Sequence, residues 1–174
     1  SPEELAVLAP FRGQEPEEVF TTAYQPPVTD GSGNPRANLR RALELLGQAG
    51  WVLKDNKLVN GQSGAPFKFE IVDQSPVFER WVGPFIANLK RLGIEASYRV
   101  VDSAQYQNLM NDYDFDMTMA VFAQSLSPGN EQLDYWGSSR AAIKGSRNLP
   151  GVRDPVVDAL IDQLLQAPDR QGLV

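Results

Sequence analysis

The sequence predicts an α/β fold with a largely parallel sheet and flanking helices. Three strand patterns, at residues 67–72, 94–101 and 115–122, alternate with two helical patterns, at 75–92 and 103–110. Strand–helix–strand units with short links form right-handed crossovers between parallel strands. With 174 residues, 42% of them hydrophobic, the chain is long enough to bury one sizeable core.

The first 33 residues precede the clear elements. Five prolines and the turn Asp30-Gly31-Ser32-Gly33 interrupt them, and only a short helix around residues 16–20 is expected. A segment so rich in proline does not build a core of its own. We therefore predict two parts, a Pro-rich extended segment at 1–33 that packs on the rest, and an α/β lobe at 34–174.

A helix is predicted over residues 35–49. Asn34 is a favourable N-cap, Pro35 suits the first helical position, and Gly50 ends the helix. Residues 51–53 and 57–59 then flank a short polar segment, which predicts a β-hairpin.

The second helix opens at Ser75-Pro76, contains Pro84, where a kink is expected, and ends at Gly93. Its broad apolar face consists of Phe78, Trp81, Val82, Phe85, Ile86, Leu89 and Leu92. Trp51 and Trp81 are both expected in the core.

Two further helices follow. Either Asp102 or Ser103 is expected to cap the helix at 103–110, and Asp154-Pro155 begins the last helix. Between the third strand and this last helix lies a loop at 123–153, rich in Pro, Gly, Asn and Ser. Ligands of open parallel sheets bind beyond the carboxyl ends of the strands, and loops of this length are often functional. The sequence therefore places the candidate site in this loop.

Composition excludes several classes of function. The chain has no cysteine and no histidine, which rules out disulfides, thiolate zinc sites and Ser-His or Cys-His catalysis. The net charge of −6 does not suit a nucleic-acid-binding protein. No glycine-rich nucleotide loop occurs, and no apolar run reaches the roughly 18–20 residues of a membrane span.

Several segments, in their order along the chain, resemble one family. They are NLRRALELLGQAGWVLKDNKLVNGQSGAPFKFEIV, FERWVGPFIANLKRLGIEASYRVVDSAQYQNLMNDYDFDM and SRNLPGVRDPVVDALIDQLL. Together they are similar to the C-terminal lobe of the bacterial extracellular solute-binding proteins, family 5. PFRGQEPEEVFTTAYQPPVTDGSG and WGSSRAAIKGSRN look most like the Yej-type oligopeptide binders in that family.

The resemblance implies a periplasmic-binding-protein-like lobe that captures a peptide or a related solute in an interlobe cleft. Its expected partners are the missing N-terminal lobe of the same protein and the ABC permease subunits in the membrane, with no nucleic acid. The implied location is the periplasm, or the extracellular face of the membrane through a lipid anchor. No catalytic residue, metal or cofactor is expected, and the chain is not expected to be an enzyme.

The resemblance also implies which residues contact the ligand. Several peptide binders of this family place an Asp after the third strand to pair with the peptide ammonium, but this chain has no acid at 122–125. Glu131 or Asp134 replaces it from further along the loop, or both are surface carboxylates. The expected wall of the cleft consists of Phe122, Ala123, Gln124, Ser125, Asn130, Glu131, Trp136, Arg147 and Asn148.

Alternatives remain open at several of these positions. Arg147 pairs either with a ligand carboxylate or phosphate, or with Asp154 or Asp158. Trp136 and Tyr135 either line a pocket or anchor the loop. A further set of alternating carboxylates is read as a solvated strand entrance, with Ca²⁺ binding as the alternative, and consists of Asp112, Asp114 and Asp116.

Two other functions compete with ligand capture. The loop at 123–153 would serve as a docking segment if the chain were a protein-interaction module. A small hydrolase that uses Glu131 or Asp134 as its carboxylates is the second alternative.

Overall fold

The computed structural model describes residues 1–169 and residue 172. The described chain divides into two compact units, which we treat separately. The sheet unit comprises 27–110 and 114–120, and the terminal unit comprises 1–26, 111–113 and the chain from 121 onward. The Pro-rich segment predicted at 1–33 runs across the division at Pro26, and the predicted two-part organisation stays a prediction.

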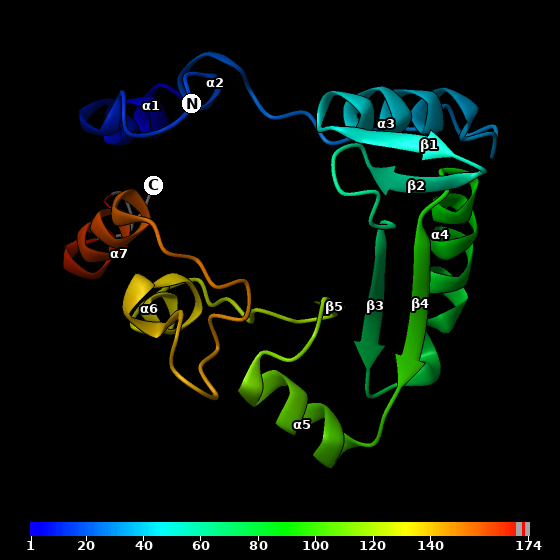
Figure 1. Cartoon of the computed structure of the whole chain (residues 1–174). Helices are drawn as coiled ribbons and strands as arrows, with labels where there is room; N and C mark the ends of the chain where they lie inside the picture. Colours follow the sequence, from blue (N-terminus) through cyan, green and yellow to red (C-terminus); the bar gives the residue numbers. More distant parts are fainter. Residues whose placement is uncertain (170–171, 173–174) are drawn as a thin grey trace. The chain divides into compact units, whose positions relative to one another are not determined.

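A parallel sheet forms the centre of the sheet unit (Figure 1). Its strands are β3 (Lys68–Asp73), β4 (Glu95–Val100) and β5 (Met117–Thr118), in the order β4-β3-β5. Lys68 pairs with Glu95 and Asp73 with Val100, so β3 and β4 are aligned over their full length. The prediction of an α/β fold with a parallel sheet is confirmed.

The third strand is much shorter than the predicted 115–122. Only Met117 and Thr118 pair with β3, opposite Ile71 and Val72. Side chains of this segment also bond to the β3 backbone. The Asp116 carboxylate accepts the Glu70 N–H at 2.9 Å, and the Thr118 hydroxyl donates to the Val72 carbonyl at 2.9 Å. The apolar run up to Phe122 therefore continues as an irregular segment.

Helix α4 (Glu79–Arg91) lies beside β4 in Figure 1, preceded by a 3-10 turn, η2 (Pro76–Phe78). Ser75 caps this turn by accepting the Val77 N–H. Of the two tryptophans expected in the core, Trp51 is half-buried against Phe67, but Trp81 is 58% exposed. The apolar residues of α4 and its two ends cover too wide an arc for the sheet to bury, so the Trp81 prediction is wrong.

Helix α3 (Arg36–Gln48) and the hairpin of β1 (Trp51–Lys54) and β2 (Lys57–Asn60) complete the sheet unit. The helix begins one residue after the predicted position, with Pro35 as its N-cap, while the Asn34 side chain accepts the Arg36 N–H. The main core is formed where these elements meet α4, and consists of Leu58, Leu92 and Ile94 with half-buried neighbours such as Leu43 and Phe69.

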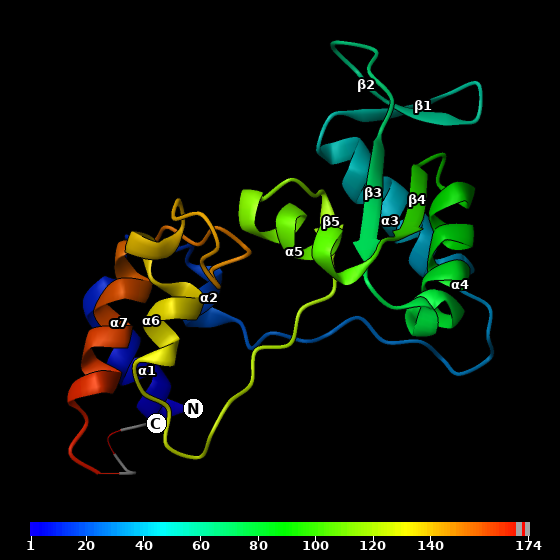
Figure 2. The ribbon, with the colours of Figure 1, turned by 90° about the horizontal axis from the view of Figure 1, so that it is seen from below.

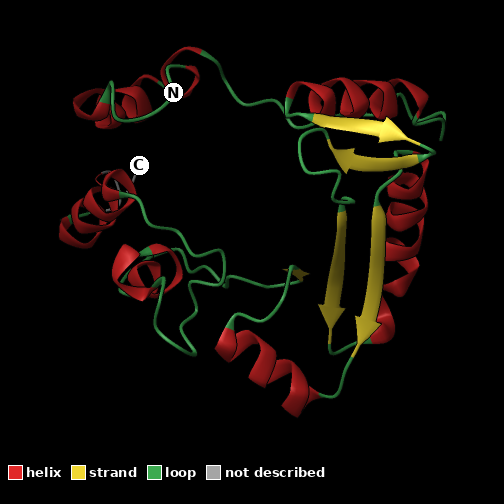
Figure 3. Cartoon of the chain, in the orientation of Figure 1, coloured by secondary structure: helices red, strands yellow, loops and turns green. Residues whose placement is uncertain are grey.

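The terminal unit contains helices that periodicity alone did not predict. These are α1 (Pro2–Leu8), with a capping box between Ser1 and Glu4, and α6 (Glu131–Trp136), which interrupts the long loop. Two 3-10 turns are η1 (Ala9–Phe11) and η3 (Ser138–Arg140). Figure 3 shows that the path around α6 is mostly irregular.

Two predicted helices of the terminal unit are present. The short helix expected near 16–20 is α2 (Glu18–Thr21). The last helix is α7 (Pro155–Gln166), and Asp154 caps it as predicted by accepting the N–H groups of Val156 and Val157. Helices α6 and α7 lie side by side (Figure 2). In the described part of the chain, no helix has both the length and the apolar content needed to cross a membrane.

Candidate functional site

Three aromatic rings gather where the irregular segment after β5 meets α6. The Phe122 ring centroid lies 4.6 Å from that of Trp136 and 5.3 Å from that of Tyr135. Tyr135 is the buried member of this cluster. It is only 2% exposed, and its hydroxyl donates to the Ala123 carbonyl at 3.3 Å. Phe122 and Trp136 are half-buried, so part of each ring faces outward. We call these three residues the aromatic cluster.

Arg147 extends the aromatic cluster with a cation. Its guanidinium carbon lies 4.5 Å from the Tyr135 ring centroid, an arrangement typical of a cation–π contact. The carboxylates considered as its partners from the sequence have other roles. Asp154 caps α7, and Asp158 accepts the Ser138 N–H at 2.8 Å. Arg147 is exposed, which leaves its planar donor edge accessible.

Asn148, by contrast, has no exposed surface. Its amide nitrogen donates to the carbonyls of Gly137 and Val152, both at 3.0 Å, and its amide oxygen accepts the Val152 N–H at 2.9 Å. The side chain thus joins the turn after α6 to the segment before α7. In this structure Asn148 positions the backbone beside Arg147, and direct contact with a ligand stays a prediction.

A row of polar side chains in contact connects the loop to α6. The Gln132 amide nitrogen lies 2.5 Å from the Gln124 side-chain oxygen and 3.4 Å from a carboxylate oxygen of Glu131. The same Glu131 oxygen accepts the Gly129 N–H at 2.8 Å, and this hydrogen bond lowers the pKa of Glu131. The ionised form of Glu131 is therefore favoured. Separately, Ser125 forms a local turn with Ser127.

The structure thus brings most of the predicted wall together within the terminal unit. Phe122, Ala123, Trp136 and Arg147 all contact the aromatic cluster or belong to it. Gln124 and Glu131 are joined through Gln132, whereas Asn130 is exposed and makes no side-chain cap to α6. Tyr135, for which the sequence left open a place in a pocket or a role as loop anchor, is buried in the aromatic cluster.

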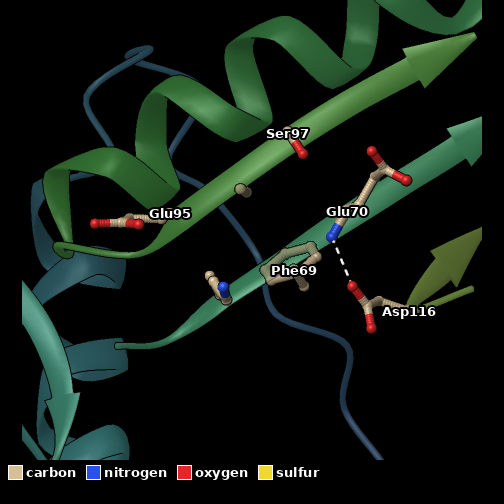
Figure 4. A pocket seen from close by; sticks show the side chains of 7 residues that line it. Phe69, Glu70, Glu95, Ser97 and Asp116 are labelled. Atoms are coloured by element: carbon tan, nitrogen blue, oxygen red, sulfur yellow. Dashed lines mark hydrogen bonds between the residues drawn. The ribbon is translucent and has the colours of Figure 1, made fainter. Parts of the chain in front are cut away.

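A hollow of about 530 Å³ lies on the sheet unit and was not predicted. Its lining residues come from β3, β4 and the segment before β5, and are Lys68, Phe69, Glu70, Glu95, Ala96, Ser97 and Asp116. Figure 4 shows Asp116 bonded to the Glu70 N–H along the edge of β3. The signal that indicates this polar surface is the alternation of charged and apolar residues in β3 and β4.

The charges of this hollow are internally compensated. Glu70 pairs with Arg99 at 2.7 Å, and Lys57 pairs with Glu95 at 2.9 Å, which lowers the pKa of Glu95. Asp112 pairs instead with Lys144 in the terminal unit. Asp112 and Asp116 thus have different partners, and in the described residues no cluster of three or more acidic side chains is arranged to hold a metal ion.

Comparison with known proteins assigns the chain to a family. The model of the bacterial extracellular solute-binding proteins, family 5 (middle part), matches residues 5–143. The chain belongs to this family. The resemblance predicted from the sequence is confirmed, and with it membership of a family of solute-binding proteins.

The family 5 chain has close relatives. It is 52% identical over 171 residues to the protein y4wM of Sinorhizobium fredii, and 43% identical over 171 residues to the probable peptide-binding protein YejA of Agrobacterium fabrum. Each alignment covers 98% of this chain, but only 26% and 28% of the respective relative. The family 5 chain therefore spans about a quarter of the length of the curated relatives it matches.

A solved structure supports the fold of the family 5 chain. This chain is similar to the oligopeptide-binding protein AppA from Bacillus subtilis, which was solved in complex with a nonapeptide. The TM-score is 0.65 and the sequence identity is 22%. The match covers 88% of this chain and 30% of AppA. It confirms the periplasmic-binding-protein-like lobe predicted from the sequence.

Proposed function

We propose that the chain is part of the substrate-binding component of an ABC importer, which captures oligopeptides or related solutes and delivers them to the membrane permease. The observation that carries this proposal is the aromatic cluster with Arg147 beside it, on the loop that follows the third parallel strand. Half-exposed rings bind apolar side chains of many shapes, and a guanidinium pairs with carboxylates.

Family membership and the relatives support the same proposal. YejA of Agrobacterium fabrum is described as a probable peptide-binding protein, and AppA binds a nonapeptide. By this analogy the protein works in the periplasm or at the outer face of the membrane, and a second lobe closes the cleft. The proposed ligand wall is the set of nine residues predicted from the sequence, with Asn148 acting by positioning the backbone.

The proposal includes the absence of catalysis by this chain. A general acid needs a raised pKa, but the Gly129 N–H lowers the pKa of Glu131. Asp134 lies 3.1 Å from the Arg140 guanidinium and so already has a cation beside it within the chain. Glu131 therefore does not have the properties of a general acid.

Titration calorimetry tests the proposed function. A mixed pool of tri- to octapeptides is titrated into this chain and into a version extended to the length of its relatives. We expect micromolar or tighter binding by the extended version, and weaker binding by this chain, because one wall offers only part of the contacts. If neither version binds any peptide, the peptide assignment is wrong.

One observation favours a second candidate, a protein-interaction module. Val121 and Leu126 flank the start of the long loop and are 87% and 83% exposed. Exposed apolar side chains of this kind are found in docking surfaces, although single ones are common on any protein. A stable complex with a folded partner through the loop 123–153, without peptide affinity, would support this function instead.

A further inference from the structure

A small pocket lies on the terminal unit, beside α6 and η3. Its volume is about 240 Å³, enough for a carboxylate group and the methylene groups that carry it. The pocket is lined by Asp134, Arg140, Ile143, Lys144, Gly145, Ser146 and Arg147. We call it the cationic pocket, because three of these residues are cations and only one is an anion.

This concentration of cations contrasts with the rest of the terminal unit. By sequence, that unit carries six Lys and Arg against twelve Asp and Glu, whereas the sheet unit carries ten of each. The whole net charge of −6 therefore belongs to the terminal unit. Three of its six cations nevertheless line one pocket. Like charges repel at short range, so their grouping requires compensation from nearby anions.

The anions present in the protein compensate only part of this charge. Asp134 lies 3.1 Å from the Arg140 Nε, yet that buried Nε makes no hydrogen bond to any described residue. The two atoms are close enough for an ion pair, but the N–H is not aimed at the carboxylate. A buried donor without an acceptor is unfavourable, so the contact with Asp134 compensates only part of the charge of Arg140.

The other two cations are available to a ligand. Lys144 pairs with Asp112, but the two side chains are 74% and 51% exposed, and such surface pairs are weak. Arg147 rests on the Tyr135 ring, which leaves its N–H groups free to point sideways in the plane of the guanidinium. Arg147 therefore belongs both to the cationic pocket and to the surroundings of the aromatic cluster.

The backbone of the pocket is held in place. Gly145 has a φ of +74° and donates to the Asn111 carbonyl at 3.0 Å, and the Tyr113 hydroxyl donates to the Ile143 carbonyl at 3.1 Å. The Ser146 hydroxyl accepts the Asn148 N–H at 3.0 Å. The loop that carries the cations is thus pre-organised, which lowers the entropy cost of binding.

We propose that the cationic pocket binds an anionic group of the captured solute, with Arg140, Lys144 and Arg147 as donors. The inference rests on the proposed function and deepens it, because it makes acidic peptides the preferred solute class. A carboxylate bound beside Arg147 leaves the adjoining part of the solute near the aromatic cluster. The chain carries no acid at 122–125, so recognition by the anionic group compensates for the missing ammonium partner.

The test uses calorimetry on the version extended to the length of its relatives. Three peptides of equal length are compared: a neutral one with an amidated C-terminus, the same peptide with a free carboxylate, and an amidated peptide with one Glu. We expect at least one anionic peptide to bind about tenfold tighter than the neutral one, with a preference that falls as salt rises. The peptide that gains affinity tells whether the pocket takes a terminal or a side-chain carboxylate.

Variants test whether the cationic pocket causes the preference for anionic over neutral peptides. Lys144→Gln and Arg147→Gln should reduce the preference severalfold, while Lys90→Gln on α4, an exposed lysine of the sheet unit, leaves it unchanged. Thermal unfolding of each variant checks that the fold is intact. Equal affinity for neutral and anionic peptides overturns this inference but leaves the proposed function standing.

A second measurement decides the matter if no peptide binds. N-acetylglutamate amide is titrated into this 174-residue chain, and the backbone amide signals of Gly145 and Ser146 are followed by NMR. Saturable shifts that disappear in Arg147→Gln support the cationic pocket even though the peptide assignment has failed. Absence of any shift at millimolar concentration overturns the pocket.

Discussion

At the scale of the residue, Asn148 shows how a polar side chain stabilises a long loop from within. It is fully buried and takes part in three hydrogen bonds with backbone groups on either side of the loop. We expect Asn148→Ala to lower the free energy of unfolding by about 2–4 kcal/mol, because the substitution leaves buried backbone groups without partners. Urea unfolding measures this. Asn130→Ala, at an exposed position, should change it by less than about 0.5 kcal/mol.

Glu131 makes the stability of the folded protein depend on pH. The Gly129 N–H lowers its pKa from the usual 4.5, so the ionised form stabilises the folded state. This contribution is complete above the unfolded-state pKa, and is lost as the pH falls through the lower folded-state pKa. An NMR titration should find the pKa of Glu131 below 4.5.

Glu131→Gln provides the control for this titration. The stability difference between the two proteins should be constant above about pH 5 and shrink in more acidic solution. A difference that does not vary with pH would contradict the assigned hydrogen bond.

Trp136 is the residue whose change should affect binding most. It is half-buried in the aromatic cluster, and truncation of a tryptophan at a binding surface commonly costs tenfold or more in affinity. We expect Trp136→Ala to weaken peptide binding by about this factor in the extended version. Trp81→Ala is the matched control, since Trp81 lies 58% exposed on the sheet unit. Similar losses in both variants would mean that the cluster is not the ligand wall.

At the scale of the element, Gly93 is the joint between α4, β4 and the hairpin. Its φ is +80°, and its carbonyl accepts the Leu58 N–H at 2.8 Å. A Cβ there would lie 2.7 Å from the Leu58 nitrogen, a backbone atom that moves only with the hairpin. We expect Gly93→Ala to lower the free energy of unfolding by about 2–4 kcal/mol.

Gly47 offers the opposite case within a helix. It lies in α3, and a Cβ added there meets no atom within 4 Å. Gly47→Ala should therefore stabilise the protein by about 0.5–1 kcal/mol, through the better helix propensity of alanine. If both glycine variants changed stability by the same amount, the close packing assigned to Gly93 would be wrong.

At the scale of the whole molecule, the division into two units predicts that the sheet unit folds by itself. It contains the parallel sheet, α3, α4 and the core around Leu58, and a fragment of this length is typical of a domain. We expect the fragment 27–120 to show cooperative thermal unfolding by circular dichroism. Leu58→Ala, which removes a side chain that is 1% exposed, should abolish or greatly weaken that transition. A fragment without cooperative unfolding would show that the sheet unit depends on the rest of the chain.

The fold class, the family and the approximate bounds of the main helices could be predicted from the amino-acid sequence alone. These features depend on local signals, such as the proline at the start of α7, the left-handed glycines after α3 and α4, and the alternation in β3. Each acts over a few neighbouring residues, so a single sequence is enough to read it. The loop that carries the candidate site was found in the same way, from its length and its position after a strand.

The tertiary structure decided what depends on residues distant in sequence. The third strand is short, with the Asp116 and Thr118 side chains bonded to the β3 backbone, and Trp81 is exposed because the sheet covers only one side of α4. Within the loop, Asn148 is buried, Arg147 lies on Tyr135, and three cations share one pocket. Burial and charge proximity are properties of the folded chain, because they follow from which distant segments come together rather than from the order of neighbouring residues.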